Sequence, residues 1–178
     1  MLREECPPLH LLVAGPFESQ DPIPADVEAT LRNDPRIHLA GMVHEMPSIY
    51  RTLGLLVLPT YREGFPASLL EVAAMELPVI ATRIPGWVDA VREGETGLLV
   101  PVRDAGALTA AIRTYLGDPK LRRQHGANGR HRALRDFDPE MLREALFQEY
   151  LRLLGERGCE EVAKSVCPNP DHLHSNKA

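Results

Sequence analysis

The chain has 178 residues, enough for one domain with a sizeable core and too few for two full ones. Its formal net charge is −5 and no basic run is present, so nucleic acid is not an expected partner. Because no apolar run approaches the roughly 18 residues of a membrane span, and the three scattered cysteines (Cys6, Cys159, Cys167) indicate a reducing compartment, we expect a cytoplasmic protein.

Short runs of Val, Ile and Leu alternate with longer amphipathic stretches. The apolar runs predict strands at residues 9–14, 37–40, 55–58, 79–82 and 97–100. Helical spacing and Asp-Pro starts predict helices at 25–32, 46–52, 67–76, 87–92, 105–116, 119–135 and 139–154. This alternation predicts an α/β fold, a Rossmann-like parallel sheet with helices on both faces. We expect residues 1–154 to form this domain and the polar, aperiodic residues 155–178 to be a disordered tail.

The segment 60–71 follows the buried strand 55–58, so it lies at the carboxyl end of a parallel strand, where open α/β sheets bind ligands. Gly64 permits unusual backbone conformations, and Pro66 stiffens the turn into the next helix. The free N–H groups of that helix's first turn, with the positive end of its dipole, suit a phosphate.

Two carboxylates bracket this anion-binding helix end. Glu63 lies in the loop, and Glu71 follows it after seven intervening residues, inside the helix. A carboxylate readily accepts hydrogen bonds from two hydroxyls, so the pair suits a ligand with hydroxyls on both sides of a diphosphate. A nucleotide sugar has this layout. The alternative is that Glu63 is a surface loop acid and Glu71 a solvated helix acid.

Three ordered motifs resemble a known family: Glu63-Gly64-Phe65-Pro66 with Glu71, then residues 77–82 (LPVIAT) and 94–100 (GETGLLV). They resemble family 4 of the retaining glycosyltransferases, which have the two-domain GT-B architecture. The similarity is strongest to bacterial enzymes that build O-antigen, capsule or other lipid-linked surface polysaccharides. It covers roughly residues 9–154 and implies the C-terminal, donor-binding half of such an enzyme.

The resemblance implies a role for each matching residue. Glu63 is the implied catalytic residue, contacting the donor hexose near the reacting carbon, and Glu71 binds the ribose hydroxyls. Backbone amides around Gly64 and Phe65 hold sugar hydroxyls, whereas Pro66 has no N–H to donate. The remaining implied positions are the diphosphate-binding amides of Ser68, Leu69 and Leu70, the base-contacting loop with Val43 and His44, and Gly15 at a strand end facing the same crevice.

The implied reaction transfers a hexose from a nucleotide-diphosphate sugar, with retention of configuration, to a glycan or lipid-linked acceptor. The resemblance implies no metal and no other cofactor, since preorganised donors stabilise the leaving diphosphate. The protein would act in the cytoplasm, peripherally at the inner face of the membrane. The alternatives are a non-catalytic nucleotide-sugar-binding subunit, an inactive fragment that needs a partner chain, and, less favoured, a nucleotide-sugar epimerase of the same fold.

The chain departs from the family pattern at Glu76, where relatives usually have Gly, and at Trp87, where they often have a small residue or Cys. In relatives the domain opens with a strand ending in Gly-Arg and a helix carrying Lys, and both elements are missing here. The missing first strand is central in the order 3-2-1-4-5-6. We therefore expect strand 9–14 to pair directly with strand 55–58 or with another chain, and the isolated chain to bind nucleotide weakly and transfer little sugar.

Other polar groups have simpler interpretations. His125 and His131 occur among the arginines of helix 119–135, which predicts a solvated face, or less simply a surface for an anionic lipid headgroup. Asp89 and Glu93 are expected at the surface. The spacing of Cys159, Cys167, His172 and His174 fits no common zinc site, so we expect a flexible tail there.

Overall fold

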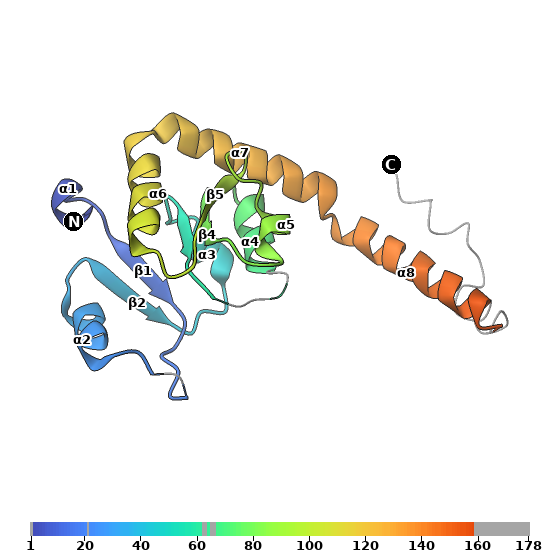
Figure 1. The fold of residues 1–178 in the computed structure, drawn as a ribbon, viewed down its shortest axis with the longest axis horizontal. Helices are drawn as coiled ribbons and strands as arrows, with labels where there is room; N and C mark the ends of the chain where they lie inside the picture. Colours follow the sequence, from blue (N-terminus) through green and yellow to red (C-terminus); the bar gives the residue numbers. More distant parts are fainter. Residues whose placement is uncertain (1, 21, 62–63, 65–66, 159–178) are drawn as a thin grey trace. The chain divides into compact units, whose positions relative to one another are not determined.

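The computed structural model describes residues 2–20, 22–61, 64 and 67–158. Its strands are β1 (Leu11–Ala14), β2 (Ile37–Gly41), β3 (Leu56–Leu58), β4 (Val79–Thr82) and β5 (Gly97–Val100). Its helices are α1 (Leu2–Glu5), α2 (Ala25–Asn33), α3 (Met46–Tyr50), α4 (Ala67–Ala74), α5 (Trp87–Ala90), α6 (Ala105–Gly117), α7 (Pro119–Asp136) and α8 (Pro139–Glu156) (Figure 1). The predicted α/β alternation is confirmed.

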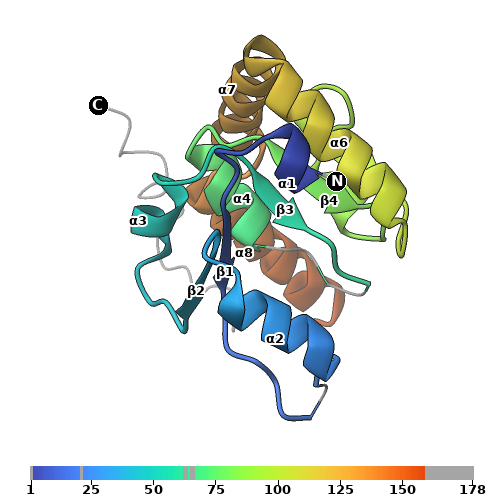
Figure 2. The same ribbon diagram turned by 90° about the vertical axis from the view of Figure 1, so that its left-hand side faces the viewer.

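All strand pairs are parallel, but they form two separate sheets. β1 pairs with β2, with Leu11 opposite Ile37, and the two strands lie side by side in Figures 1 and 2. β4 lies between β3 and β5, with Val79 opposite both Leu56 and Gly97. The sheets therefore have the orders β1-β2 and β3-β4-β5.

The expected direct pairing of β1 with β3 is wrong, since each of these strands pairs with a different neighbour in the part of the chain that the structure describes. The two observed orders are those that remain when the central strand is taken out of a 3-2-1-4-5-6 sheet. In that order the strands that correspond to β1 and β3 are next-nearest neighbours, which do not hydrogen-bond to each other. Pairing of β1 with another chain stays a prediction.

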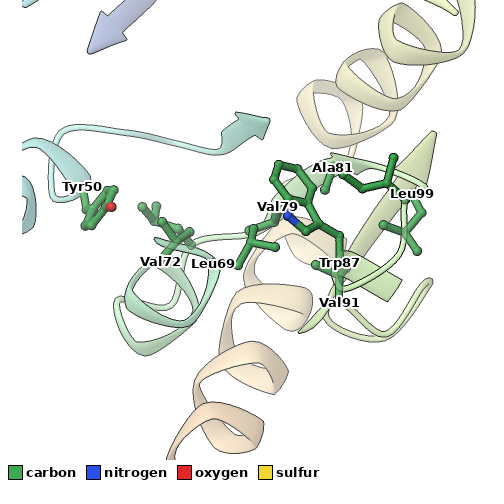
Figure 3. Packing of buried hydrophobic residues seen from close by; sticks show 10 residues of the cluster. Tyr50, Leu69, Val72, Val79, Ala81, Trp87, Val91 and Leu99 are labelled. Carbon is green, nitrogen blue, oxygen red and sulfur yellow. The ribbon is translucent and has the colours of Figure 1, made fainter. Parts of the chain in front are cut away.

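The core lies on both faces of the β3-β4-β5 sheet. Side chains on one face pack with α3, α4 and α5, and this cluster consists of Tyr50, Leu69, Val72, Leu77, Val79, Ala81, Ile84, Trp87, Val91 and Leu99 (Figure 3). The opposite face packs with α6 through a second cluster of Ile80, Val100, Ala111 and Tyr115. Successive β4 residues alternate between these clusters, as period-two geometry requires, so every residue of β4 is buried.

Helix α7 is packed more closely than its charged sequence predicts. His125, Gly126, Gly129 and Ala133 are all buried, and a Cβ added at Gly126 would lie 2.0 Å from the carbonyl oxygen of Glu76. The predicted solvated face is therefore wrong for His125, because the neighbouring glycines let the helix approach close enough to bury the imidazole. Arg132 also turns inward and donates to the carbonyls of Asp89 and Ala90. His131 is exposed, as expected.

A second compact unit begins at Leu134. Its helix α8 starts at Pro139, where the Asp138 side chain accepts a hydrogen bond from the N–H of Glu140 at 2.7 Å. None of the α8 residues is buried. The helix ends at Glu156, two residues beyond the predicted end, and most of the expected tail, with its Cys and His residues, lies outside the described residues. Among the described helices, none is long and apolar enough to cross a membrane.

Candidate functional site

The predicted anion-binding helix end is built by β3 and α4. β3 ends at Leu58, and α4 begins at Ala67 after a loop in which Gly64 is exposed. Leu69 is buried in the core and anchors the first turn, while Ser68 and Leu70 are half-buried. The first amides of a helix have no partner within the helix, which is the general basis of anion binding at helix N-termini.

Three of the predicted site residues cannot be placed. Glu63, Phe65 and Pro66 lie outside the described residues. The roles that the resemblance implies for them, including the catalytic role of Glu63, therefore stay predictions.

Glu71 has a partner that the sequence did not reveal. It is exposed, and its Oε2 accepts a hydrogen bond of 3.0 Å from the hydroxyl of Tyr50, the last residue of α3. The Tyr50 side chain is 3% exposed and packs in the same core cluster as Leu69 and Val72. Burial, together with the negative Glu71 carboxylate, raises the pKa of Tyr50 to about 12, so the phenol keeps its proton at neutral pH.

Gly15 and His44 come from the other sheet. Gly15 follows β1 with φ 122°, a value that favours glycine, and its N–H donates to the carbonyl of Gly41 at 2.8 Å. His44 is exposed and Val43 is half-buried in the loop that runs from β2 into α3. Within the described part of the chain no hydrogen bond joins Gly15 or His44 to Glu71; the loop with His44 leads into the helix that carries Tyr50.

A pocket of about 310 Å³ lies at the carboxyl ends of β3, β4 and β5. Its lining residues are Pro59, Tyr61, Thr82, Val100, Pro101, Arg103, Asp104, Ala105 and Leu108. The Arg103 guanidinium lies 5.2 Å from the centre of the Tyr61 ring, at the start of the loop that leads to Glu63. Tyr61, Thr82 and Val100 belong to the segments 60–71, 77–82 and 94–100 named above, but no pocket was predicted there. The position of Pro59, Thr82 and Val100 at strand ends is the signal that would have found it.

Among the residues that the structure describes, no group of three or more His, Cys, Asp or Glu side chains could hold a metal ion. His10 and His38 stack with ring centroids 5.1 Å apart and ring nitrogens 2.8 Å apart, but this pair has no third ligand there. The described part of the site thus offers helix amides and a carboxylate, which are groups for an anion and for hydroxyls.

Comparison with known proteins agrees with this geometry. A family model described as "Glycosyl transferases group 1" matches residues 1–118. The capsular polysaccharide biosynthesis glycosyltransferase CapM of Staphylococcus aureus is 35% identical over 82% of this chain and 38% of its own length. The lipopolysaccharide core biosynthesis mannosyltransferase LpcC of Rhizobium leguminosarum bv. viciae is 36% identical over 76% of this chain and 38% of its own.

Two solved structures are also similar. Sucrose-phosphate synthase of Thermosynechococcus elongatus superposes with a TM-score of 0.73 at 33% identity, over 83% of this chain and 39% of that one. The C-terminal domain of the group 1 glycosyltransferase LpcC of Francisella tularensis has a TM-score of 0.68 at 25% identity, over 77% of this chain and 74% of that domain.

The parallel α/β fold of this chain is that of a glycosyltransferase domain. The chain belongs to the group 1 glycosyltransferases, and its match to an isolated C-terminal domain shows which half it represents. It spans about 38% of the length of the two curated relatives.

Proposed function

We propose that this chain binds the donor of a retaining glycosyltransferase that moves a hexose from a nucleotide-diphosphate sugar to a glycan or lipid-linked acceptor. The observation that carries the proposal is the placement of Glu71. This exposed acid lies on α4, the helix that follows the end of a parallel strand, and it accepts a hydrogen bond from the Tyr50 hydroxyl. Two relatives that act in capsule and lipopolysaccharide synthesis, one of them a mannosyltransferase, support a role in surface polysaccharide synthesis.

In this proposal the diphosphate lies against the first turn of α4. The amides of Ser68, Leu69 and Leu70 donate to its oxygens, and the helix dipole stabilises its charge. Glu71 accepts hydrogen bonds from the ribose hydroxyls, and His44 and Gly15 contribute the base side of the site. We assign the hexose side to Glu63, with Gly64, Phe65 and Pro66 forming the turn around the sugar.

Charge stabilisation by preorganised donors is what a departing diphosphate needs, so we propose that the site works without a metal. We further propose that residues 1–154 form the donor domain and that a further polypeptide segment or a partner chain supplies the acceptor side. We also propose that the chain acts in the cytoplasm and that, if the acceptor is the lipid-linked one, the reaction occurs at the inner face of the membrane.

Replacement of Glu71 by Ala tests the proposal. We expect the 178-residue chain to bind UDP or GDP weakly by titration calorimetry or ligand-observed NMR. Glu71→Ala is expected to weaken binding by about tenfold or more, since it removes a charged hydrogen-bond partner from the bound complex. Binding is expected to be unchanged in EDTA.

The control is Glu140→Ala, which removes an exposed helix acid from α8. This variant is expected to bind like the parent chain. If the parent chain binds neither UDP nor GDP, or if Glu71→Ala binds as well as Glu140→Ala, the proposed donor site is wrong.

A further inference from the structure

The Tyr50 hydroxyl donates a hydrogen bond to the carboxylate of Glu71, the acid that we expect to bind the ribose hydroxyls. Its aromatic ring lies beside Val72 in the core, as Figure 3 shows, so the ring orientation is fixed by packing. Only the hydroxyl end meets a polar partner, the Oε2 atom of Glu71 at 3.0 Å. A side chain this deeply buried acts on a ligand through Glu71 and not by touching the ligand itself.

An exposed glutamate on a helix ordinarily samples several rotamers. The hydrogen bond from Tyr50 favours the Glu71 rotamers that place Oε2 next to the phenol hydroxyl. This bond uses one of the roughly four hydrogen-bond acceptor positions of a carboxylate. Within the described residues no hydrogen bond reaches Oε1 of Glu71, so this oxygen can accept hydrogen bonds from a ligand. Because Glu71 is already ordered in the free protein, ligand binding does not have to overcome the loss of conformational entropy of this side chain.

The same bond joins two segments that are distant in sequence. Tyr50 ends α3, the helix entered from the loop that carries His44, whereas Glu71 lies on α4. Burial and the Glu71 carboxylate raise the pKa of Tyr50 to about 12. The phenol is therefore protonated at neutral pH and can donate the hydrogen bond to Glu71. The link therefore couples the loop expected at the base to the acid expected at the ribose.

We propose that Tyr50 is a positioning residue for nucleotide recognition: it fixes the Glu71 carboxylate so that its free oxygen accepts hydrogen bonds from the vicinal hydroxyls of a ribose. This inference rests on the proposed function. It states that Tyr50 contributes to binding only when the ligand carries that diol and only when Glu71 is present to accept it.

The experiment compares UDP and GDP with their 2′,3′-dideoxy counterparts on the 178-residue chain. Tyr50→Phe is expected to weaken binding of the tighter ribonucleotide by about fivefold and that of its dideoxy counterpart by less than about twofold. In a Glu71→Ala background, where the side-chain acceptor for the Tyr50 hydroxyl is gone, adding Tyr50→Phe is expected to change neither affinity. Both ligands are measured on the same sample, so their ratio does not depend on how much of a variant is folded.

Tyr115→Phe is the matched control. Tyr115 is also a buried tyrosine with a paired hydroxyl, but it belongs to the other core cluster and its hydroxyl contacts His125. This variant is expected to leave the ratio of the two affinities unchanged, which separates positioning from a general loss of core hydrogen bonding.

The outcomes separate the two proposals. Equal weakening of both ligands by Tyr50→Phe, or a further ribonucleotide-specific loss in the Glu71→Ala background, overturns the positioning role. Unchanged binding in Tyr50→Phe with a large loss in Glu71→Ala also overturns it, while leaving the proposed function in place. If Glu71→Ala has no effect, or the parent chain does not distinguish ribose from dideoxyribose, the proposed ribose site itself fails.

Discussion

The β3-β4-β5 sheet and the β1-β2 sheet have the same parallel hydrogen bonding but differ in how their side chains are covered. Every residue of β4 is buried, with α4 on one face of the strand and α6 on the other. In contrast, β1 contains no buried residue and α2 has none either. Leu11 of β1 is 47% exposed, whereas Ile80 of β4 is 0% exposed.

This difference shows that backbone pairing alone does not make a strand a stable part of a fold. Local stability follows buried apolar contacts, so we expect the β3-β4-β5 sheet to open last and the β1-β2 sheet to open early. The candidate site draws on both. Glu71 and Tyr50 lie on α4 and α3, helices that pack on the β3-β4-β5 sheet, and Gly15 and His44 lie in segments that follow strands of the other sheet. The acid at the site is therefore held more firmly than the loop expected at the base.

The largest expected effect comes from truncating one apolar side chain in a strand of each sheet. Ile80→Ala is expected to lower the free energy of unfolding by about 3–4 kcal/mol, because it removes buried methyl groups and leaves a cavity. Leu11→Ala is expected to cost less than about 1 kcal/mol, since half of that side chain already faces solvent. Urea unfolding of the two variants measures both costs, and equal costs would contradict the comparison.

The next effect tests how closely α7 is packed. Gly126→Ala is expected to destabilise the fold by about 2–3 kcal/mol, because the new methyl group would lie 2.0 Å from the Glu76 carbonyl oxygen and the helix must shift. Gly117→Ala serves as the control, since nothing lies within 4 Å of a Cβ at that position. A control as damaging as Gly126→Ala would show that the close approach is not the cause. Thermal and urea unfolding provide the measurement.

The smallest expected effect is a pH dependence from His125. This residue is 2% exposed, and its Nδ1 lies 2.8 Å from the Tyr115 hydroxyl. Burial lowers the pKa of His125 below its ordinary value of 6.5, and a backbone hydrogen bond with Gly94 opposes this only in part. The unfolded chain therefore binds a proton more readily than the folded one, so the contribution is complete above about pH 6.5 and falls as the pH drops towards the folded-state pKa.

The loss is expected to be below about 1.4 kcal/mol for each pH unit, which is the limit for one proton. Urea unfolding at pH 7.5 and 5.5 should show it in the parent chain and less of it in His125→Gln. The exposed His131 offers the control, since His131→Gln should keep the full pH dependence. A parent chain and His125→Gln with the same pH profile would rule out this role for the imidazole.

Sequence patterns located most elements and one of the key side chains. The strand expected at 79–82 and the helix expected from 67 match β4 and the start of α4, because period-two and helical spacing record which face is buried. Other helix and strand boundaries differ from the predicted ones because of local hydrogen bonds. The strand expected from residue 9 begins at Leu11, because the N–H of Leu9 instead donates to the carbonyl of Cys6 at 3.0 Å.

The partners of the polar groups could not be predicted in the same way. Tyr50 has the spacing of a core residue, and nothing near it in sequence indicates that its hydroxyl meets an acid 21 positions away. Arginines around His125 favour a solvated helix, yet Gly126 and Gly129 bring that face against the rest of the domain. Such contacts depend on which helices approach one another, which no local pattern records.

The sequence by itself determined the α/β class, the strand-end helix with Glu71 and the family resemblance, because these depend on residue types at short, regular spacings. Tertiary structure alone decided that the strands form two sheets, that His125 is buried and that Tyr50 holds Glu71. The physical reason is the distance along the chain over which each feature is determined. Periodicity within one element fixes which of its faces is apolar. A hydrogen bond or a close backbone contact between two elements depends on how those elements are placed in space.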